Sequence, residues 1–400
     1  MGYRIANGEA LLQQTWDAAL NEESQENDIM TDMTGTYSDS TRKIPDAAIM
    51  RVMMKPGANS HTLGLLMDLT GAGRQGAGVA LTGFTESMDT RKQTVYANDV
   101  RHGVNIDNFG LYAFRNEPYK LMEEVNGLLS KWLKGRRGKH MRQAMLEKVS
   151  DNLETSPTSL TAGWNKNIIV KNVADGSQPT YDSTLADYTS NLNTALSSAG
   201  TTSAANLDIS FFTHLEYYVT TQWKLKPMED GTYICTVPAR QARYLKVLDG
   251  TESISGLMRT TLSTKVAEQA WAQTLPQIGK LRLLVDDRAP IINRNSATGV
   301  LTAAYRDVGS TDERSSYTNT GNNTVWDVGM VFGKGAIIEA IMMKPRYDED
   351  LTDIGRLKDV GMSTTYGFQV NEYDDDTATD STRKAQSGGV YLSYSGTATA

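Results

Sequence analysis

The chain has 400 residues, with 40 Lys and Arg against 47 Asp and Glu, so its formal net charge is −7 and its isoelectric point lies near 5.3. This length suits two or three average domains with a sizeable core, and it excludes a wholly disordered chain. The acidic balance excludes a surface built throughout for nucleic acid, so any such contact must be local.

Cysteine usage and hydropathy indicate the compartment. Cys235 is the single cysteine, so the chain forms no internal disulfide and lacks the paired thiolates of common zinc sites. No apolar run reaches the ~18 residues of a membrane span, and the N-terminal segment has no apolar core of signal-peptide length. We therefore expect a soluble protein made in a reducing cytoplasm.

The N-terminal quarter predicts an arm followed by a hairpin. Residues 1–45 are polar and poorly periodic, which is typical of an arm with little core of its own. Short apolar runs at 49–54 and 63–69, a Gly-dense turn and a loosely alternating run at 94–104 follow. This order predicts strands around a long hairpin.

One long helix is predicted between Pro118 and Asn152, where apolar residues recur every three or four positions. Pro118 suits the first turn of such a helix. Gly135 and Gly138 each cost about 1 kcal/mol relative to Ala in a helix interior, so we expect a bend or short break there.

The second half alternates helix and strand patterns, which together with the hairpin predicts an α+β fold. The predicted helices cover 211–219, the residues from 238 to 249, 257–271 and a short buried segment at 335–343. The predicted strands are 233–237, 280–285, 325–332 and a closing pair at 364–373 and 390–394 around the acidic turn 374–376.

A glycine-rich motif raises the possibility of a nucleotide enzyme. Gly71-Ala72-Gly73-Arg74-Gln75-Gly76 matches G-x-G-x-x-G, and Asp99 lies not far from where a ribose-binding acid would fall. The motif should open a helix, but further glycines follow it closely. A flexible loop at a hairpin tip is therefore the favoured interpretation, with no cofactor.

Other catalytic patterns are weaker still. The four histidines stand far apart without metal-ligand spacing, and the acidic segments 348–350 and 374–376 lack the spacing and central Gly of a calcium loop. We expect solvated turns at both acidic segments. No G-x-S-x-G elbow supports a hydrolase.

Positive charge is concentrated in the predicted long helix. Its candidate DNA-facing residues are Lys134, Arg136, Arg137, Lys139 and Arg142. The opposite face is expected to join the core through Leu128, Leu129, Trp132 and Met145, which would leave the basic side exposed. A solvated helix face and a patch that faces phosphate both explain this cluster, and composition does not choose between them.

The order of several segments resembles the major capsid proteins of N-four-like tailed phages, a branch of the Hong Kong 97-type capsid fold. The segments that carry the resemblance are LTGAGRQGAGVALTGFTES (69–87), VYANDVRHGV (95–104), KLKPMEDGTYICTVPARQARYLKVLD (224–249), TTYGFQVNEYDD (364–375) and KAQSGGVYLSYS (384–395). The resemblance covers most of the chain from about residue 49 onward and is weak in 155–206 and 295–323.

This resemblance implies a division of the chain. It comprises an N-terminal arm (1–48), an extended loop hairpin (49–105), a peripheral domain with a spine helix (106–159), an axial domain (160–325) and C-terminal peripheral strands (326–400). In the family's fold the spine helix lies along the inner surface of the shell, so the basic side would face packaged DNA.

The resemblance also implies a function without catalysis: a subunit that assembles into the icosahedral head shell as hexamers and pentamers. The expected inter-subunit loop residues are Leu65, Leu66, Met67, Leu69, Gly71, Gly73, Gly76 and Gly78. Expected partners are further copies of the chain, the portal protein, decoration or scaffolding proteins and double-stranded DNA bound without sequence preference, and the expected location is the virion, assembled in the host cytoplasm. The alternatives are another phage structural module, such as a tail or baseplate protein, and the nucleotide-binding enzyme.

Overall fold

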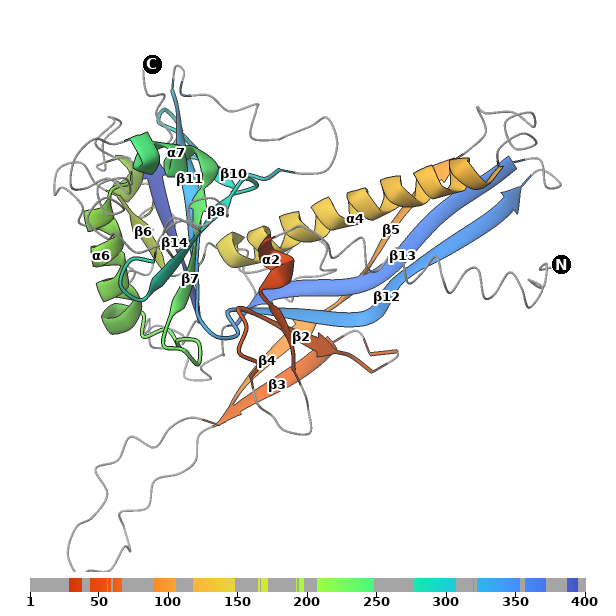
Figure 1. Cartoon of the computed structure of the whole chain (residues 1–400), viewed down its shortest axis with the longest axis horizontal. Coiled ribbons are helices and arrows are strands. Elements are labelled where there is room, and N and C mark those ends of the chain that lie inside the picture. Colours follow the sequence, from red (N-terminus) through yellow and green to blue (C-terminus); the bar gives the residue numbers. More distant parts are fainter. Residues whose placement is uncertain are drawn as a thin grey trace, which may run out of the picture.

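The computed structural model of the chain combines two β-sheets, a separate hairpin and a small number of helices (Figure 1). The structure describes residues 29–37, 44–55, 57–58, 60–66, 90–105, 118–147, 165, 167–171, 192, 194–197, 207–247, 277–306, 319, 322–352, 357–371 and 387–394. Within this part of the chain the fold is α+β, as the sequence predicts.

A five-stranded sheet is built around two long strands from the C-terminal third. Its order is β1 (Thr34–Thr36), β2 (Ile49–Met53), β12 (Ile337–Thr352), β13 (Leu357–Val370) and β5 (Asn98–Asn105). β12 and β13 pair antiparallel over almost their full length, whereas β2 runs parallel to the start of β12. The sheet therefore joins segments that lie far apart in the sequence.

A seven-stranded sheet forms the other end of the molecule. Its strands are β6 (Ile168–Val170), β7 (Tyr233–Pro238), β8 (Leu281–Asp286), β9 (Ile291–Asn295), β10 (Leu301–Ala304), β11 (Asn323–Phe332) and β14 (Gly388–Tyr394). β11 lies at its centre, because it pairs with β9 and β7 on one side and with β14 on the other. Only a few residues separate the end of β11 from the start of β12, so the chain passes directly from one sheet to the other.

Short helices accompany the seven-stranded sheet. α6 (Ile209–Tyr217) begins at Asp208, whose carboxylate accepts a hydrogen bond from the backbone N–H of Phe211 at 2.7 Å. The helix continues into η3 (Tyr218–Gln222). β7 ends at Pro238, and α7 (Ala239–Val247) follows at once. The predicted helix at 211–219 and strands at 233–237 and 280–285 are thus confirmed.

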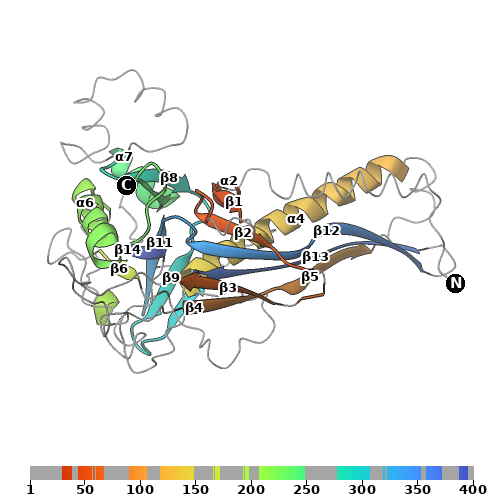
Figure 2. The ribbon, with the colours of Figure 1, turned by 90° about the horizontal axis from the view of Figure 1, so that it is seen from below.

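The long helix α4 (Pro118–Glu147) runs alongside β5, β13 and β12 in both views (Figures 1 and 2). It is unbroken at Gly135 and Gly138, so the predicted break there is wrong. Both glycines are buried, and burial of the surrounding helix offsets their poor helix propensity. Of the expected core face, Leu129 and Met145 are buried, but Leu128 is 59% exposed.

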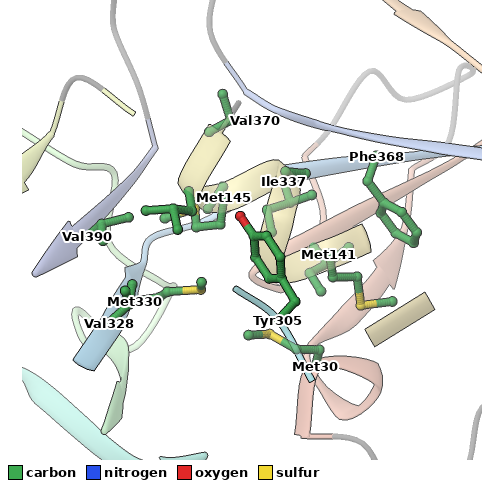
Figure 3. Close-up of a cluster of buried hydrophobic side chains, with 14 of the residues drawn as sticks. Met30, Met141, Met145, Tyr305, Val328, Met330, Ile337, Phe368, Val370 and Val390 are labelled. Carbon is green, nitrogen blue, oxygen red and sulfur yellow. The ribbon is translucent and has the colours of Figure 1, made fainter. Parts of the chain in front are cut away.

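One hydrophobic core connects the two sheets (Figure 3). Met30 of α2 (Ile29–Asp32), Met141 and Met145 of α4, Met330 of β11 and Phe368 of β13 all belong to it. A second cluster lies between the seven-stranded sheet and α6. Because the first cluster takes side chains from both sheets, α4 packs at their junction.

Three predicted elements are corrected by the structure. The segment predicted as a buried helix, 335–343, instead contains the start of strand β12. The predicted closing strands do occur, as β13 and β14, but they belong to different sheets and do not pair with each other. The run 94–104 is divided between β4 (Thr90–Tyr96) and β5.

Candidate assembly surfaces and a buried ion-pair junction

The second half of α4 is enclosed on all sides. Every residue from Arg137 to Leu146 is buried, although this stretch includes two arginines, a lysine and a histidine. Charged side chains are rarely buried unless they are paired, so this helix segment must meet partners on the surrounding elements.

Arg142 is paired with the seven-stranded sheet. Its Nε and Nη2 donate to the two carboxylate oxygens of Asp286, at the end of β8, at 2.8 and 2.7 Å. Its Nη1 donates to the carbonyl oxygen of Gly138 at 3.0 Å. The Arg142 and Asp286 side chains are only 2% and 1% exposed. This two-bond geometry is the strongest form of an arginine–carboxylate pair.

Arg137 is paired with the five-stranded sheet. Its Nη2 contacts the Glu339 carboxylate, on β12, and the Nε of Arg51, on β2, donates to the other oxygen of the same carboxylate at 2.7 Å. Glu339 is completely buried. Two residues five positions apart on α4, Arg137 and Arg142, therefore attach the helix to the two different sheets.

Further polar contacts fasten this end of the helix. The His140 ring lies 3.2 Å, through Nδ1, from the Tyr366 hydroxyl on β13. The Tyr305 hydroxyl donates to the Glu147 carboxylate at 2.8 Å, and the Asn165 amide donates to the carbonyl of Met145 at 2.9 Å. Two carbonyls of the last helical turn, those of Met145 and Leu146, thus accept hydrogen bonds from Asn165, and the Glu147 carboxylate accepts one from Tyr305.

The prediction of an exposed basic side is wrong for three of its five residues. Arg137, Lys139 and Arg142 are buried within the chain, with exposed fractions of 5%, 8% and 2%. The physical reason is that α4 is covered by two sheets, whereas the prediction assumed one buried face. Lys134 and Arg136 are partly exposed, so a DNA-facing role stays a prediction for these two residues.

Two acidic residues in apolar surroundings indicate these ion pairs in the sequence, although the pattern of the helix itself does not. Glu339 stands within an apolar run, and Asp286 directly follows the apolar strand at 281–285. A carboxylate in such a position needs a buried cationic partner.

The hairpin of β3 (Ser60–Leu66) and β4 is a sheet of its own. Its base packs on the five-stranded sheet through Leu63 and Val95, and the Gln93 amide donates to the carbonyl of Val370 at 2.6 Å. Leu65 and Leu66 lie at the end of β3, and nothing is described of their side chains. Met67, Leu69, Gly71, Gly73, Gly76 and Gly78 lie outside the described residues, so the inter-subunit loop stays a prediction.

The described part of the arm contributes side chains to the hydrophobic core, whereas the sequence predicted an arm with little core of its own. Met30 is fully buried and Met33 is 6% exposed, both within the core that joins the sheets. β1 pairs in parallel with β2. The segment from residue 29 onward is therefore an integral part of the fold.

The features weighed as enzyme chemistry do not come together in the described residues. The motif at 71–76 lies outside them. The Asp99 carboxylate on β5 accepts hydrogen bonds from the hydroxyl of Thr365 on β13 and from Arg101 on its own strand, and these two bonds, the first more than the second, lower the pKa of its carboxyl. Within the described ranges, no three His, Cys, Asp or Glu residues gather as metal ligands do. No described helix has the length and apolar character needed to cross a membrane.

The remaining candidates occupy separate elements. The histidines His61, His102, His140 and His214 lie on β3, β5, α4 and α6. The acidic segment 348–350 is part of strand β12, so the expected turn is wrong there, and Asp348 accepts a hydrogen bond from Ser363 at 2.8 Å. The segment 374–376 lies outside the described residues.

Cys235 is an inert thiol at the centre of the seven-stranded sheet. It is fully buried, and this burial raises the pKa of its thiol to about 12. The neighbouring Tyr391 hydroxyl, whose own pKa is raised well above its usual value by burial, donates to the carbonyl of Thr236 at 2.8 Å. A thiol that is shielded from solvent and stays protonated at neutral pH does not react, so Cys235 serves as a core side chain.

Comparison with known proteins identifies the fold. No family model and no curated protein matches the chain. Solved structures do: the head structure of Helicobacter pylori bacteriophage KHP40 has a TM-score of 0.57 at 12% identity, with 92% of both chains covered. The acid-stable capsid of Helicobacter pylori bacteriophage KHP30 has a TM-score of 0.57 at 11% identity, covering 91% of this chain and 90% of that one.

The capsid asymmetric unit of cyanophage Pam1 has a TM-score of 0.53 at 13% identity, with 91% of this chain and 89% of that chain covered. These likenesses cover about nine-tenths of the chain. The N-four-like branch stays a prediction. The capsid fold that the sequence resemblance implied is confirmed: this chain has the α+β fold of phage capsid chains.

Proposed function

We propose that this chain is the major capsid protein of a tailed bacteriophage, the subunit that assembles into the icosahedral head shell enclosing the genome. The observation that carries the proposal is the fold likeness to phage head and capsid chains, which covers 92% of this chain and 92% of the other in one case. A likeness restricted to one sheet would suit many functions, but one across the whole chain favours the same architectural role.

The shape of the subunit supports this proposal. β12, β13 and α4 extend as a long limb away from the seven-stranded sheet (Figure 1), and the hairpin β3–β4 packs on the five-stranded sheet through Leu63 and Val95. Extended strands expose edges with unpaired backbone N–H and C=O groups, and such edges tend to pair with another chain. In a shell, neighbouring copies provide that cover.

The proposed division of the subunit follows the sequence resemblance. The arm (1–48), the extended loop (49–105), the peripheral domain (106–159 and 326–400) and the axial domain (160–325) would be the functional units, with the loop and the arm making contacts between copies. The seven-stranded sheet takes β6 to β10 and the first residues of β11 from the proposed axial segment, and the rest of β11 and β14 from the C-terminal segment. Domain boundaries fall where few contacts cross, so an axial unit built on this sheet would also include β11 and β14.

Further partners belong to the same proposal. A portal protein at one vertex, decoration or scaffolding proteins and packaged duplex DNA would contact the shell, which would be assembled in the host cytoplasm and end in the virion. The subunit would have no catalytic role. Hexamers and pentamers would arise from heterologous contacts whose rotation closes into rings.

Expression of the full chain followed by negative-stain microscopy tests the proposal. Closed shells, or rings of five and six subunits, are the expected result. Open tubes or trimers would favour the alternative of a tail or baseplate protein. A saturable rise in melting temperature with NAD, NADP or ATP would favour the nucleotide enzyme, because ligand at 100 times its dissociation constant stabilises a protein by about 2.7 kcal/mol.

A further inference from the structure

The chain contains three Asp-Gly pairs, at 175–176, 230–231 and 249–250, and the second of them lies within the described residues. This pair is prone to succinimide formation, because glycine has no side chain to hinder the attack of its backbone nitrogen on the preceding carboxyl group. The Asp230 side chain is 41% exposed and so is open to water. The Asp230–Gly231 bond therefore combines a reactive sequence with an exposed side chain.

The reaction of such a pair needs no reactant other than water. The nitrogen of Gly231 loses its proton and bonds to Cγ of Asp230, and one carboxyl oxygen leaves as water to give a five-membered succinimide ring. Water then adds to either carbonyl carbon of the ring, and the C–N bond at that carbon breaks. One product is the original aspartate. The other is isoaspartate, in which the backbone runs through Cβ and Cγ at unchanged mass.

The turn that contains Asp230 holds the attacking nitrogen. The N–H of Gly231 donates to the carbonyl of Met228 at 2.9 Å, and the N–H of Met228 donates to the carbonyl of Thr232 at 2.9 Å. Met228 is 8% exposed and belongs to the core that joins the two sheets, so the turn is fixed at its base. The Gly231 nitrogen must therefore give up a hydrogen bond before it can attack.

The carboxylate of Asp230 is held by three donors. Its Oδ1 accepts from the backbone N–H of Thr232 at 3.0 Å and from the Thr232 hydroxyl at 2.6 Å. Its Oδ2 lies 2.6 Å from Nη2 of Arg282, on β8. The two Thr232 bonds, and after them the charge of Arg282, lower the pKa of the Asp230 carboxyl. Less of the neutral carboxyl, which is the better electrophile, is then present.

We propose that Thr232 and Arg282 protect the Asp230–Gly231 bond of the folded chain from conversion to isoaspartate. The carboxylate must leave both side chains and gain a proton before its Cγ can meet the Gly231 nitrogen. Reactions between neighbouring groups are fast only in a near-attack geometry, and these contacts keep the carboxylate out of it. In the proposed shell a subunit would not be renewed after assembly, so this protection would preserve the turn for the life of the particle.

Storage of the full-length chain in mildly acidic buffer, followed by tryptic digestion and chromatography, tests the proposal. The bond lies in the tryptic peptide 225–240, whose isoaspartyl form separates from the normal form at the same mass. The folded wild-type chain should form isoaspartate at position 230 more slowly, by about tenfold or more, than the chain unfolded in guanidinium chloride, since several hydrogen bonds must break first. Thr232→Val and Arg282→Met should each raise the rate in the folded chain by about three- to tenfold, the weight of one lost contact.

The matched control is Lys280→Met, which removes an exposed cation two residues before Arg282 and leaves the ion pair with Asp230 in place. Its rate at position 230 should equal that of the wild type. The Asp-Gly bonds at 175–176 and 249–250, measured in the same digests, should keep their wild-type rates in every variant, which separates loss of protection from general unfolding. Equal rates in folded and unfolded wild type would overturn the proposal. So would unchanged rates in both variants, an equal rise in Lys280→Met, or a common rise at all three bonds.

Discussion

At the scale of single residues, two ion pairs explain how one helix holds two sheets. Arg142 meets Asp286 of β8, and Arg137 meets Glu339 of β12, all four being buried. Buried pairs add little net stability relative to apolar residues of the same shape, but the loss of one partner leaves an uncompensated charge. The pairs therefore specify the position of α4 more than they stabilise it.

Arg142→Met should destabilise the chain by about 3–5 kcal/mol, because it leaves the Asp286 carboxylate buried without its partner. Arg142→Met combined with Asp286→Leu should recover most of that loss, since neither charge remains. Urea unfolding of the unassembled chain gives the free energies for this double-mutant cycle. A double variant as unstable as the sum of the two single variants would contradict the pairing.

Cys235 should not react with thiol reagents near pH 8 until the chain unfolds, because its thiol is fully buried and its pKa is raised to about 12. The raised pKa stabilises the fold fully below the unfolded value of 9.0, and this contribution is lost as the pH rises towards 12. Absorbance of a coloured thiol reagent in native and denatured protein measures the reactivity. Full reaction in the native protein would show that the seven-stranded sheet opens.

At the scale of elements, the sequence predicts most helices and strands with a clear period or clear ends, and it assigns the wrong type to one apolar segment, 335–343. The 3.6-residue period of 118–147 and the apolar strand at 233–237 are both found in the structure. The helix predicted at 335–343 is not, because Ile337 and Ile341 pack towards α4 while Ile338 and Ala340 pack towards the hairpin. A strand covered on both sides is apolar throughout and cannot be told from a buried helix by period.

The ion pairs of α4 could be predicted from the sequence only in part. The cluster of positive charge on α4 is visible in the sequence, but its burial is not, because the covering sheets come from distant segments. The acid that pairs with Arg142 lies 144 positions away in the chain, and the acid that pairs with Arg137 lies 202 positions away. Long-range pairing of this kind leaves no local pattern. Only the isolated acids in apolar surroundings point to it.

The part of the arm that contains Met30, Met33 and β1 should contribute to the stability of the fold. Removal of residues 1–40 should lower the free energy of unfolding by several kcal/mol more than removal of 1–28 does. The longer deletion takes Met30 and Met33 out of the core and removes β1, and loss of one buried Met side chain alone costs about 2–5 kcal/mol. Thermal unfolding of both truncated chains measures this difference.

If the arm makes contacts between copies, the chain lacking 1–28 should remain a folded monomer that no longer forms shells. Deletion of residues 70–84 tests the hairpin in the same way, because the hairpin base at Leu63 and Val95 keeps its packing. Specific interfaces usually bury more than ~1,000 Å², so the loss of either element should abolish assembly. Normal closed shells from both truncated chains, seen by electron microscopy, would contradict the proposed contacts.

At the scale of the whole molecule, the two sheets share one hydrophobic core. The core that includes Met141, Met330 and Phe368 is continuous across them, and β11 leads into β12 with a short connection. A subunit of the proposed shell would have to keep its parts together under contacts from several neighbours. The shared core and the two ion pairs of α4 provide that continuity, which two sheets joined by a flexible linker would lack.

The inner surface of the proposed shell gives the last prediction. Of the five basic candidates on α4, Lys134 and Arg136 are those with partial exposure, so they alone can meet DNA without disrupting the fold. Shells with Lys134→Glu and Arg136→Glu should assemble normally but retain DNA less well as salt is raised. Removal of one phosphate interaction lowers the log–log salt slope of binding by roughly 0.9 on duplex DNA.

The matched control is the double charge reversal Lys224→Glu and Lys226→Glu, because these lysines are exposed, have the same spacing and are not part of α4. Shells with this control should hold DNA as the wild type does. DNA retained by purified shells at increasing salt is measured by absorbance and by dye binding. If the α4 variant fails to assemble while the control assembles, Lys134 and Arg136 contact a neighbouring copy, since a charge reversal at a protein interface places like charges together. A DNA-facing role for the helix would then be excluded. Lys134 and Arg136 would bind a neighbouring copy, while Arg137, Lys139 and Arg142 are buried within the chain itself.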